Sequence, residues 1–187
     1  DIDANVRLVT EYIRNAAKDG ARFITTPEDT CHIRGQMREK LSSVTDDVNT
    51  RVIQHFKDLA QGLGVYILVG SLSVRVRTDK LANRSYLFGP EGRDPVIYDK
   101  IHLFDADVGL CGYRESDVFI HGEKAVLTQV DGSSVGMTIC YDIRFPHLYR
   151  TLAKAGAQII TAPAAFACET GDAHWESLLR ARAIENG

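Results

Sequence analysis

The chain of 187 residues lacks the features that mark several specialised protein classes. Its four cysteines form no C-x-x-C pair and no cluster with the six histidines, so the usual zinc-ligand spacings are absent. The net charge is only −3 and the basic residues are dispersed, which argues against binding to nucleic acid or to a membrane surface. No apolar run approaches the roughly 20 residues that span a bilayer.

The composition is that of an ordinary globular protein. Hydrophobic residues make up 44% and charged residues 25%, and the length suffices for one sizeable core without demanding two. We therefore expect one domain over residues 1–187. No signal peptide is visible and no disulfide is needed for a core of this size, so we expect free thiols and a cytoplasmic location.

Apolar periodicity predicts helices alternating with strands. The first helix is expected to be capped by Asp3 and ended by Gly20, and the last to be capped by Asp172. Pro146 suits the first turn of the helix that follows Cys140. After the first helix, the predicted helices cover 47–61, 146–155 and 172–185. The predicted strands cover 22–26, 65–71, 85–88, 96–98, 126–130, 134–139 and 159–162.

Two connections are distinctive. Residues 100–123 show no clear period and predict a long loop, which in a compact domain is usually functional. Asp131-Gly132 between two short apolar runs predicts a tight hairpin. With no internal repeat or linker, the order of elements predicts an α/β fold in which helices cover the outer faces of sheets, as in a layered sandwich.

Cys140 is the most informative residue. A short β-branched run, Gly136-Met137-Thr138-Ile139, leads into it, and Phe145-Pro146 opens a helix soon afterwards. A cysteine at such a corner is held by the sheet but can face a pocket, where a nucleophile is useful. Taken alone, a thiol there is more often a small buried hydrophobe. It becomes reactive only with a base and a partner that stabilises the product of its attack.

Three charged residues occupy comparable positions. Glu28 follows the predicted strand 22–26, Lys100 follows the strand 96–98, and Glu115 lies in the long loop. If the strands share a direction, Glu28, Lys100 and Cys140 can meet at one edge of the sheet. Taken singly, each charged residue could equally be a solvated surface side chain.

These residues lie in segments that resemble the signature motifs of the nitrilase superfamily, the carbon–nitrogen hydrolases. The segments are Pro27-Glu28, Asp99-Lys100-Ile101-His102-Leu103-Phe104-Asp105 and Cys140-Tyr141-Asp142-Ile143-Arg144-Phe145-Pro146, in matching order and spacing. The later runs 165–176 and 180–186 resemble the Nit amidase branch, which includes ω-amidases and amidases of deaminated glutathione. The resemblance extends over essentially the whole chain.

The resemblance implies an α-β-β-α four-layer sandwich and a thiol mechanism without a metal or an organic cofactor. Cys140 would attack an amide carbonyl and form a thioester, and Glu28 would move the protons. Lys100 and the backbone N–H of Tyr141 would stabilise the oxyanion, while Glu115 would orient Lys100 or the substrate. Burial of Glu28 would raise its pKa toward neutrality, although the Lys100 ammonium would lower it.

The same branch implies a small carboxylate-bearing amide as substrate, with release of ammonia or an amine. Arg144 would bind the carboxylate, since its planar fork suits that group, and Phe166 and Thr170 would line the pocket. Arg144 could instead have only a structural role, pairing with Asp142 or capping a loop. The alternatives are a nitrilase or N-carbamoyl hydrolase with the same three residues, or a non-catalytic interaction module.

A Cys–His hydrolase is a further alternative because His174 lies in the matched tail, although a packing role fits its neighbours better. We expect His102 to orient the loop after Lys100. The remaining cysteines, Cys31, Cys111 and Cys168, are interpreted as structural thiols. Family members usually form dimers, for which the helix 146–155 is our candidate surface. They also usually have further segments at both ends, so the chain is expected to be incomplete at its N- and C-termini.

Overall fold

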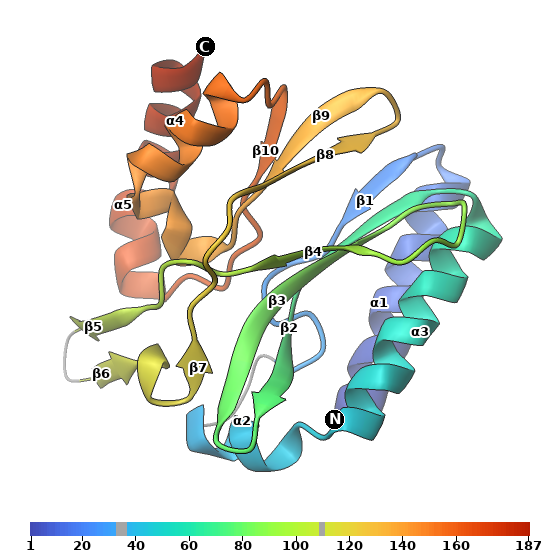
Figure 1. Cartoon of the computed structure of the whole chain (residues 1–187), viewed down its shortest axis with the longest axis horizontal. Coiled ribbons are helices and arrows are strands. Elements are labelled where there is room, and N and C mark those ends of the chain that lie inside the picture. The colour runs from blue at the N-terminus through green and yellow to red at the C-terminus, as the bar shows by residue number, and fades with distance from the viewer. Residues whose placement is uncertain (33–36, 109–110) are drawn as a thin grey trace.

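In the computed structural model, two β-sheets lie face to face between two pairs of helices (Figure 1). The structure describes residues 1–32, 37–108 and 111–187. One helix pair covers the larger sheet and the other covers the smaller sheet (Figure 1). This is the predicted α-β-β-α order. The covering helices are α1 (Ile2–Lys18) and α3 (Asp46–Leu63) on one side, and α4 (Pro146–Lys154) and α5 (Cys168–Asn186) on the other.

The larger sheet has the strand order β1-β2-β3-β4, with β7 also paired to β3. Strands β1 and β2 run parallel, so the chain leaves both at the same edge. The pairs β2–β3 and β3–β4 are antiparallel, and β2–β3 contains register shifts typical of bulges. The strands are β1 (Phe23–Thr25), β2 (Tyr66–Arg77), β3 (Lys80–Phe88), β4 (Val96–Asp99) and β7 (Phe119–Ile120).

The smaller sheet has the order β10-β9-β8, with β10 (Ile159–Thr161) parallel to β9 (Ser133–Met137) and β8 (Val126–Val130) antiparallel to it. The turn between β8 and β9 is the predicted Asp131-Gly132. Both residues have positive φ, 50° and 80°, as the primed hairpin turns require. The hairpin prediction is therefore confirmed.

The core includes two large layers of apolar contacts and a smaller cluster around Leu81 and Phe119. Between the larger sheet and its helices, Phe56 of α3 and Ile67 of β2 are completely buried. Between the sheets, Leu68 of β2 packs with Met137 of β9, and this cluster reaches Cys140. Burying a side chain of this size stabilises the fold by about 1.5–3 kcal/mol. The second cluster therefore anchors the segment that carries the thiol.

The prediction of a structureless loop over 100–123 was wrong in part. It contains the hairpin β5 (Asp105–Val108) and β6 (Cys111–Arg114), the short helix η1 (Glu115–Asp117) and strand β7. Each of these strands has four residues or fewer, which is too short for an apolar pattern to be a clear signal. Residues 109–110 of this predicted loop lie outside the described residues.

Other boundaries also differ from the prediction. The first helix is capped by Asp1, whose side chain accepts from Ala4 N, and not by Asp3. The last helix begins at Cys168, so Asp172 lies inside it. Strands β2 and β3 extend well beyond the predicted 65–71 and 85–88 because tertiary pairing continues through polar residues. Helix α2 (Met37–Ser43) was not predicted.

Across residues 1–32, 37–108 and 111–187, none of the helices combines the length and the apolar character that a bilayer crossing requires.

Candidate active site

Glu28 lies just beyond β1, in a loop that is packed closely against β2. A side-chain carbon at Gly70 would lie 2.0 Å from the Thr26 carbonyl oxygen, so only glycine permits this approach. The Gly70 N–H also donates to Thr26 Oγ1 at 3.0 Å. Glu28 is 5% exposed, and its Oε2 accepts from Ala165 N at 2.9 Å. The loop therefore holds a buried carboxylate in one orientation.

Lys100 follows β4, and its side chain is only 2% exposed. Its backbone N–H donates to Asn83 O at 2.9 Å, which continues the β3–β4 pairing past the strand end. Its Nζ lies 3.0 Å from Glu28 Oε1 and 2.9 Å from Glu115 Oε2. The three residues that the sequence placed on separate segments are thus joined in one ionic network.

Glu115 begins η1 and is buried, which excludes the surface role that a polar loop suggested. Its backbone N–H donates to Phe104 O at 3.2 Å, and its Oε2 accepts from Phe104 N at 2.6 Å. These bonds tie Glu115 to the segment that leads from Lys100 into β5. Glu115 therefore gives the Lys100 ammonium a second carboxylate partner besides Glu28.

Asn83 of β3 is a site residue that the sequence analysis missed. Its Nδ2 donates to Glu28 Oε1 at 2.9 Å and to Glu115 Oε1 at 3.1 Å. It thereby bridges the two carboxylates that Lys100 also bridges. The only available signal was an asparagine inside a strand, a position that this residue type disfavours.

Cys140 opens the short helix η2 (Cys140–Arg144), three residues after β9 ends. It is 8% exposed and has a φ of 44°. A non-glycine residue in this region is strained, and such strain concentrates at functional sites. Its backbone N–H donates to Pro163 O at 2.8 Å, and its thiol lies close enough to Glu28 for that carboxylate to raise the thiol pKa.

Asp142 joins the Cys140 turn to the segment after Lys100. It is fully buried. Its Oδ1 accepts from His102 N at 3.0 Å and lies 2.7 Å from His102 Nδ1. Its Oδ2 accepts from Tyr98 Oη at 2.6 Å and from Ile139 N at 2.9 Å. The orienting role predicted for His102 agrees with this geometry, and Asp142 is not the partner of Arg144.

The charges at the site are set by burial and by Lys100. Burial opposes ionisation of Glu28, but the Lys100 ammonium and the hydrogen bonds from its neighbours outweigh it and lower the Glu28 pKa. The expected shift toward neutrality was therefore wrong. Burial also opposes the charge on Lys100, yet Glu28 and Glu115 raise its pKa. Burial, together with the Glu28 carboxylate, raises the pKa of the Cys140 thiol.

A cavity of about 330 Å³ opens onto this network. Phe166 and Thr170 line it, as predicted. Arg144 is absent from the lining. Its guanidinium lies 5.8 Å from the ring centre of Tyr141 and 5.3 Å from that of Phe166, two rings that do line it. The complete lining is Glu28, Asp29, Lys40, Asn83, Lys100, Phe104, Tyr113, Glu115, Phe119, Cys140, Tyr141, Ala165, Phe166, Ala167 and Thr170.

His174, Cys31 and Cys168 are separate from this network. His174 Nδ1 lies 3.3 Å from Arg144 Nη2, whereas the Cys140 thiol interacts with Glu28. Cys31 is buried, and this burial raises its pKa to about 12, consistent with a structural thiol. Cys168 is exposed, and the side chain of Cys111 lies outside the described residues. In the described part of the chain, no three His, Cys, Asp or Glu side chains gather as metal ligands.

Comparison with known proteins places this geometry in context. The profile of the family described as "Carbon-nitrogen hydrolase" matches residues 1–187. The deaminated glutathione amidase of Yersinia enterocolitica is 47% identical over 137 residues, covering 71% of this chain and 48% of the relative. Omega-amidase NIT2 of Homo sapiens is 34% identical over 183 residues, covering 97% of this chain and 65% of the relative. The chain thus spans between about half and two thirds of the length of these two relatives.

Solved structures agree on the fold. The NitFhit protein of C. elegans superposes with a TM-score of 0.87 at 29% identity, over 100% of this chain and 46% of that chain. Saccharomyces cerevisiae Nit3, a member of branch 10 of the nitrilase superfamily, superposes with a TM-score of 0.84 at 28% identity, over 100% of this chain and 67% of that chain. The predicted nitrilase-type sandwich is confirmed.

Proposed function

Because the chain belongs to the carbon–nitrogen hydrolase family, we propose that it is a thiol amidase that cleaves the C–N bond of a small carboxylate-bearing amide. One observation supports the proposal above all others. A single buried carboxylate, Glu28, forms an ion pair with the Lys100 ammonium at 3.0 Å and interacts with the Cys140 thiol, and all three side chains line one cavity. A base, a nucleophile and a cation are thereby assembled around one reacting position.

In the first half of the reaction, Cys140 attacks the amide carbon. Its thiol is neutral at rest because its pKa is raised, and Glu28 is ionised because its pKa is lowered. The Sγ–H proton passes to Glu28 as the S–C bond forms. Glu28 then delivers that proton to the nitrogen, the C–N bond breaks, and ammonia or an amine leaves a thioester on Cys140.

In the second half, water hydrolyses the thioester. Glu28 takes a proton from the water as its oxygen attacks the acyl carbon, and returns the proton to the departing Cys140 sulfur. The carboxylic acid product leaves and the resting thiol is restored. Both halves pass through a tetrahedral intermediate whose oxygen carries a negative charge, so the site has to stabilise that charge twice.

Lys100 and Tyr141 are suited to this task. The Lys100 Nζ already lies between two carboxylates, and Glu115 holds it in place at 2.9 Å. Tyr141 lies in the first turn of η2, where backbone N–H groups have no acceptor within the helix. Loss of one such donor typically raises the barrier by about 3 kcal/mol.

The substrate assignment rests on the part of the cavity wall formed by segment 165–170. Phe166 and Thr170 line it, and Arg144 lies against the Phe166 ring at the boundary of the lining. We assign Arg144 to the carboxylate of the acyl chain, which makes dicarboxylate monoamides the preferred substrates. The relatives named deaminated glutathione amidase and omega-amidase support this class. A nitrilase or an N-carbamoyl hydrolase with the same residues is the alternative.

The remaining assignments follow from the same family. We assign residues 1–187 to one catalytic domain and place the protein in the cytoplasm, where the free thiols Cys31, Cys140 and Cys168 stay reduced. We expect a homodimer or a higher homo-oligomer in which α4 lies near the contact, and His147 and Arg150 are exposed on this helix.

Release of ammonia or amine from a panel of ω-amides, nitriles and N-carbamoyl compounds tests the activity. We expect turnover of ω-amides, loss of turnover in Cys140→Ala, and normal turnover in Cys168→Ala, which changes an exposed thiol instead. Turnover of nitriles or carbamoyl compounds alone would favour the alternatives. No turnover on any compound, with no labelling of Cys140 by iodoacetamide, would favour a non-catalytic module.

Arg144→Ala tests the substrate handle within the same panel. We expect a steep rise in KM for carboxylate-bearing amides and little change for neutral amides of equal length. An equal rise for both kinds of amide would refute this role of Arg144.

A further inference from the structure

Lys40 of α2 brings a second buried ammonium to the cavity that contains Cys140. Its side chain is only 4% exposed, and its Nζ forms an ion pair with Asp29. Both residues line the same cavity as Cys140 and Lys100. In the proposed mechanism Lys100 stabilises the oxyanion, and Lys40 has no role.

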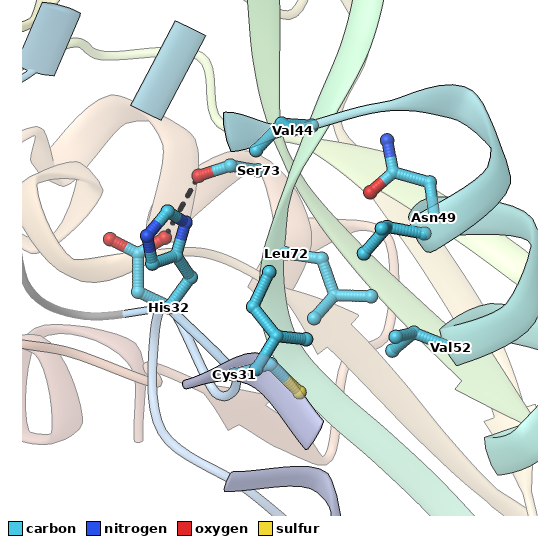
Figure 2. A pocket seen from close by; sticks show the side chains of 10 residues that line it. Cys31, His32, Val44, Asn49, Val52, Leu72 and Ser73 are labelled. Atoms are coloured by element: carbon cyan, nitrogen blue, oxygen red, sulfur yellow. Dashed lines mark hydrogen bonds between the residues drawn. The ribbon is translucent and has the colours of Figure 1, made fainter. Parts of the chain in front are cut away.

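Asp29 is held firmly where it meets Lys40. Its Oδ1 accepts from Ser73 Oγ at 3.1 Å, the dashed line that leaves Ser73 in Figure 2. Its backbone N–H donates to Ser71 Oγ at 2.9 Å, and its φ of 52° is rare for a non-glycine residue. The backbone is thus constrained at the residue directly after Glu28.

The other side of Asp29 is closed by packed side chains. Figure 2 shows Cys31, Val44 and Leu72 around a small cavity there. Its volume of about 20 Å³ leaves room for about one water molecule. Among the described residues, the larger cavity that contains Cys140 is therefore the space through which a ligand can reach the Lys40–Asp29 pair.

The pair has capacity for a further anion. A buried ion pair is often no more stabilising than apolar side chains of similar volume, so its presence in a cavity wall suggests a use. Lys40 Nζ has three N–H donors, and Asp29 is its partner among the described residues. Lys100 in the same site serves two carboxylates at 3.0 and 2.9 Å, so this environment accommodates an ammonium between two anions.

The position of the pair indicates which part of the substrate it would meet. Glu28 has to reach the leaving nitrogen to protonate it, and Asp29 is the next residue, with its Cα about 3.8 Å further along the chain. The Lys40–Asp29 pair therefore adjoins the residue that protonates the leaving nitrogen. Arg144 lies against Tyr141 and Phe166, the part of the wall that we assigned to the acyl chain.

We propose that Lys40, held by Asp29, binds a carboxylate carried by the leaving amine. The preferred substrates are then secondary amides of an amino acid, and the first product is that amino acid with its nitrogen protonated by Glu28. This inference rests on the proposed amidase function. It adds a specificity site that separates substrates releasing an amino acid from primary amides releasing ammonia.

Two amides with the same acyl group test the proposal. N-succinylglycine releases glycine, and N-methylsuccinamic acid releases methylamine. We expect the purified protein to prefer the glycine amide in kcat/KM. Lys40→Met should reduce that preference about 10- to 100-fold through KM, the range for a lost hydrogen bond to a charged group. Lys57→Met is the matched control, since Lys57 pairs with Asp94 at 3.1 Å outside the cavity lining.

The pattern of kinetic changes separates recognition from a structural role. A fall in kcat by the same factor for both amides in Lys40→Met would overturn the proposal, because it would mean that Lys40 only supports Glu28. Asp29→Asn leaves the ammonium in place and should keep the preference for glycine. If Lys40→Met does not fold, the double variant Lys40→Met/Asp29→Asn replaces it, because this variant leaves no buried carboxylate without a partner. The double variant should show the same loss of preference.

Binding to Cys140→Ser, measured by calorimetry, separates this inference from the proposed function. We expect the glycine amide to bind more tightly than the methyl amide, and Lys40→Met to remove the difference. Absence of turnover in the wild type with this binding pattern intact would refute the amidase assignment alone. Equal binding of the two amides before the Lys40 change would refute the carboxylate site, whether or not the protein turns them over.

Discussion

Replacement of Asp142 by asparagine should destabilise the protein by about 3–5 kcal/mol, because the buried carboxylate accepts hydrogen bonds on both oxygens. Oδ1 faces His102 N and Nδ1, and Oδ2 faces Tyr98 Oη and Ile139 N. An amide has one NH₂ group. In either orientation that group faces a backbone N–H, from His102 or from Ile139, so a buried donor loses its acceptor.

The magnitude follows from two contributions. A buried donor left without an acceptor costs about 1–3 kcal/mol, and loss of the carboxylate charge weakens the remaining bonds by a similar amount. Tyr98→Phe removes only one of the four contacts and should cost less, about 1.5–3 kcal/mol. Both changes should also lower kcat, because Asp142 joins the Cys140 turn to the segment that carries Lys100.

Urea unfolding followed by circular dichroism measures the loss of stability. Asp94→Asn is the control, because Asp94 is almost fully exposed in its pair with Lys57 and should change the stability by less than about 1 kcal/mol. A change below 1 kcal/mol for Asp142→Asn would refute the reasoning, since it would mean that the four contacts contribute little to the folded state.

Two further predictions concern the Glu28 loop. Gly70→Ala would place a carbon 2.0 Å from the Thr26 carbonyl oxygen and should cost about 3 kcal/mol or more in urea unfolding, whereas Gly62→Ala, which meets nothing within 4 Å in α3, should stabilise by about 0.5–1 kcal/mol. The Glu28 pKa is lowered from 4.5, so its contribution to stability is present above pH 4.5 and is lost as the pH falls through the lower folded value. Stability should therefore decline less steeply with acidification in Glu28→Gln than in the wild type, and equal slopes would contradict the lowered pKa.

The sequence located the residues whose positions follow from strand ends. Glu28, Lys100 and Cys140 each come just after a run with a clear apolar pattern, and the motifs around them matched in order. Cys140 could therefore be identified even though a lone cysteine is usually a structural residue. The hairpin at Asp131-Gly132 was equally local, since the turn chemistry is contained in two residues.

Other residues could not be found because their roles depend on contacts between distant segments. Asn83 lies inside a strand and meets Glu28 across 55 positions of sequence. Lys40 lies on a helix of seven residues, too short for an apolar period to mark it. The Glu28 pKa depends on the balance between burial and the Lys100 charge, and that balance is set by the folded geometry.

The central claim is that Cys140 carries the acyl group during turnover. Mass spectrometry of peptides from the protein, quenched in acid while it turns over an ω-amide, measures this directly. The account predicts that the mass of the acyl group appears on the peptide containing Cys140 and disappears once the substrate is consumed. An acyl group on Cys31 or Cys168 instead, or undiminished turnover of the amide by Cys140→Ala, would contradict it.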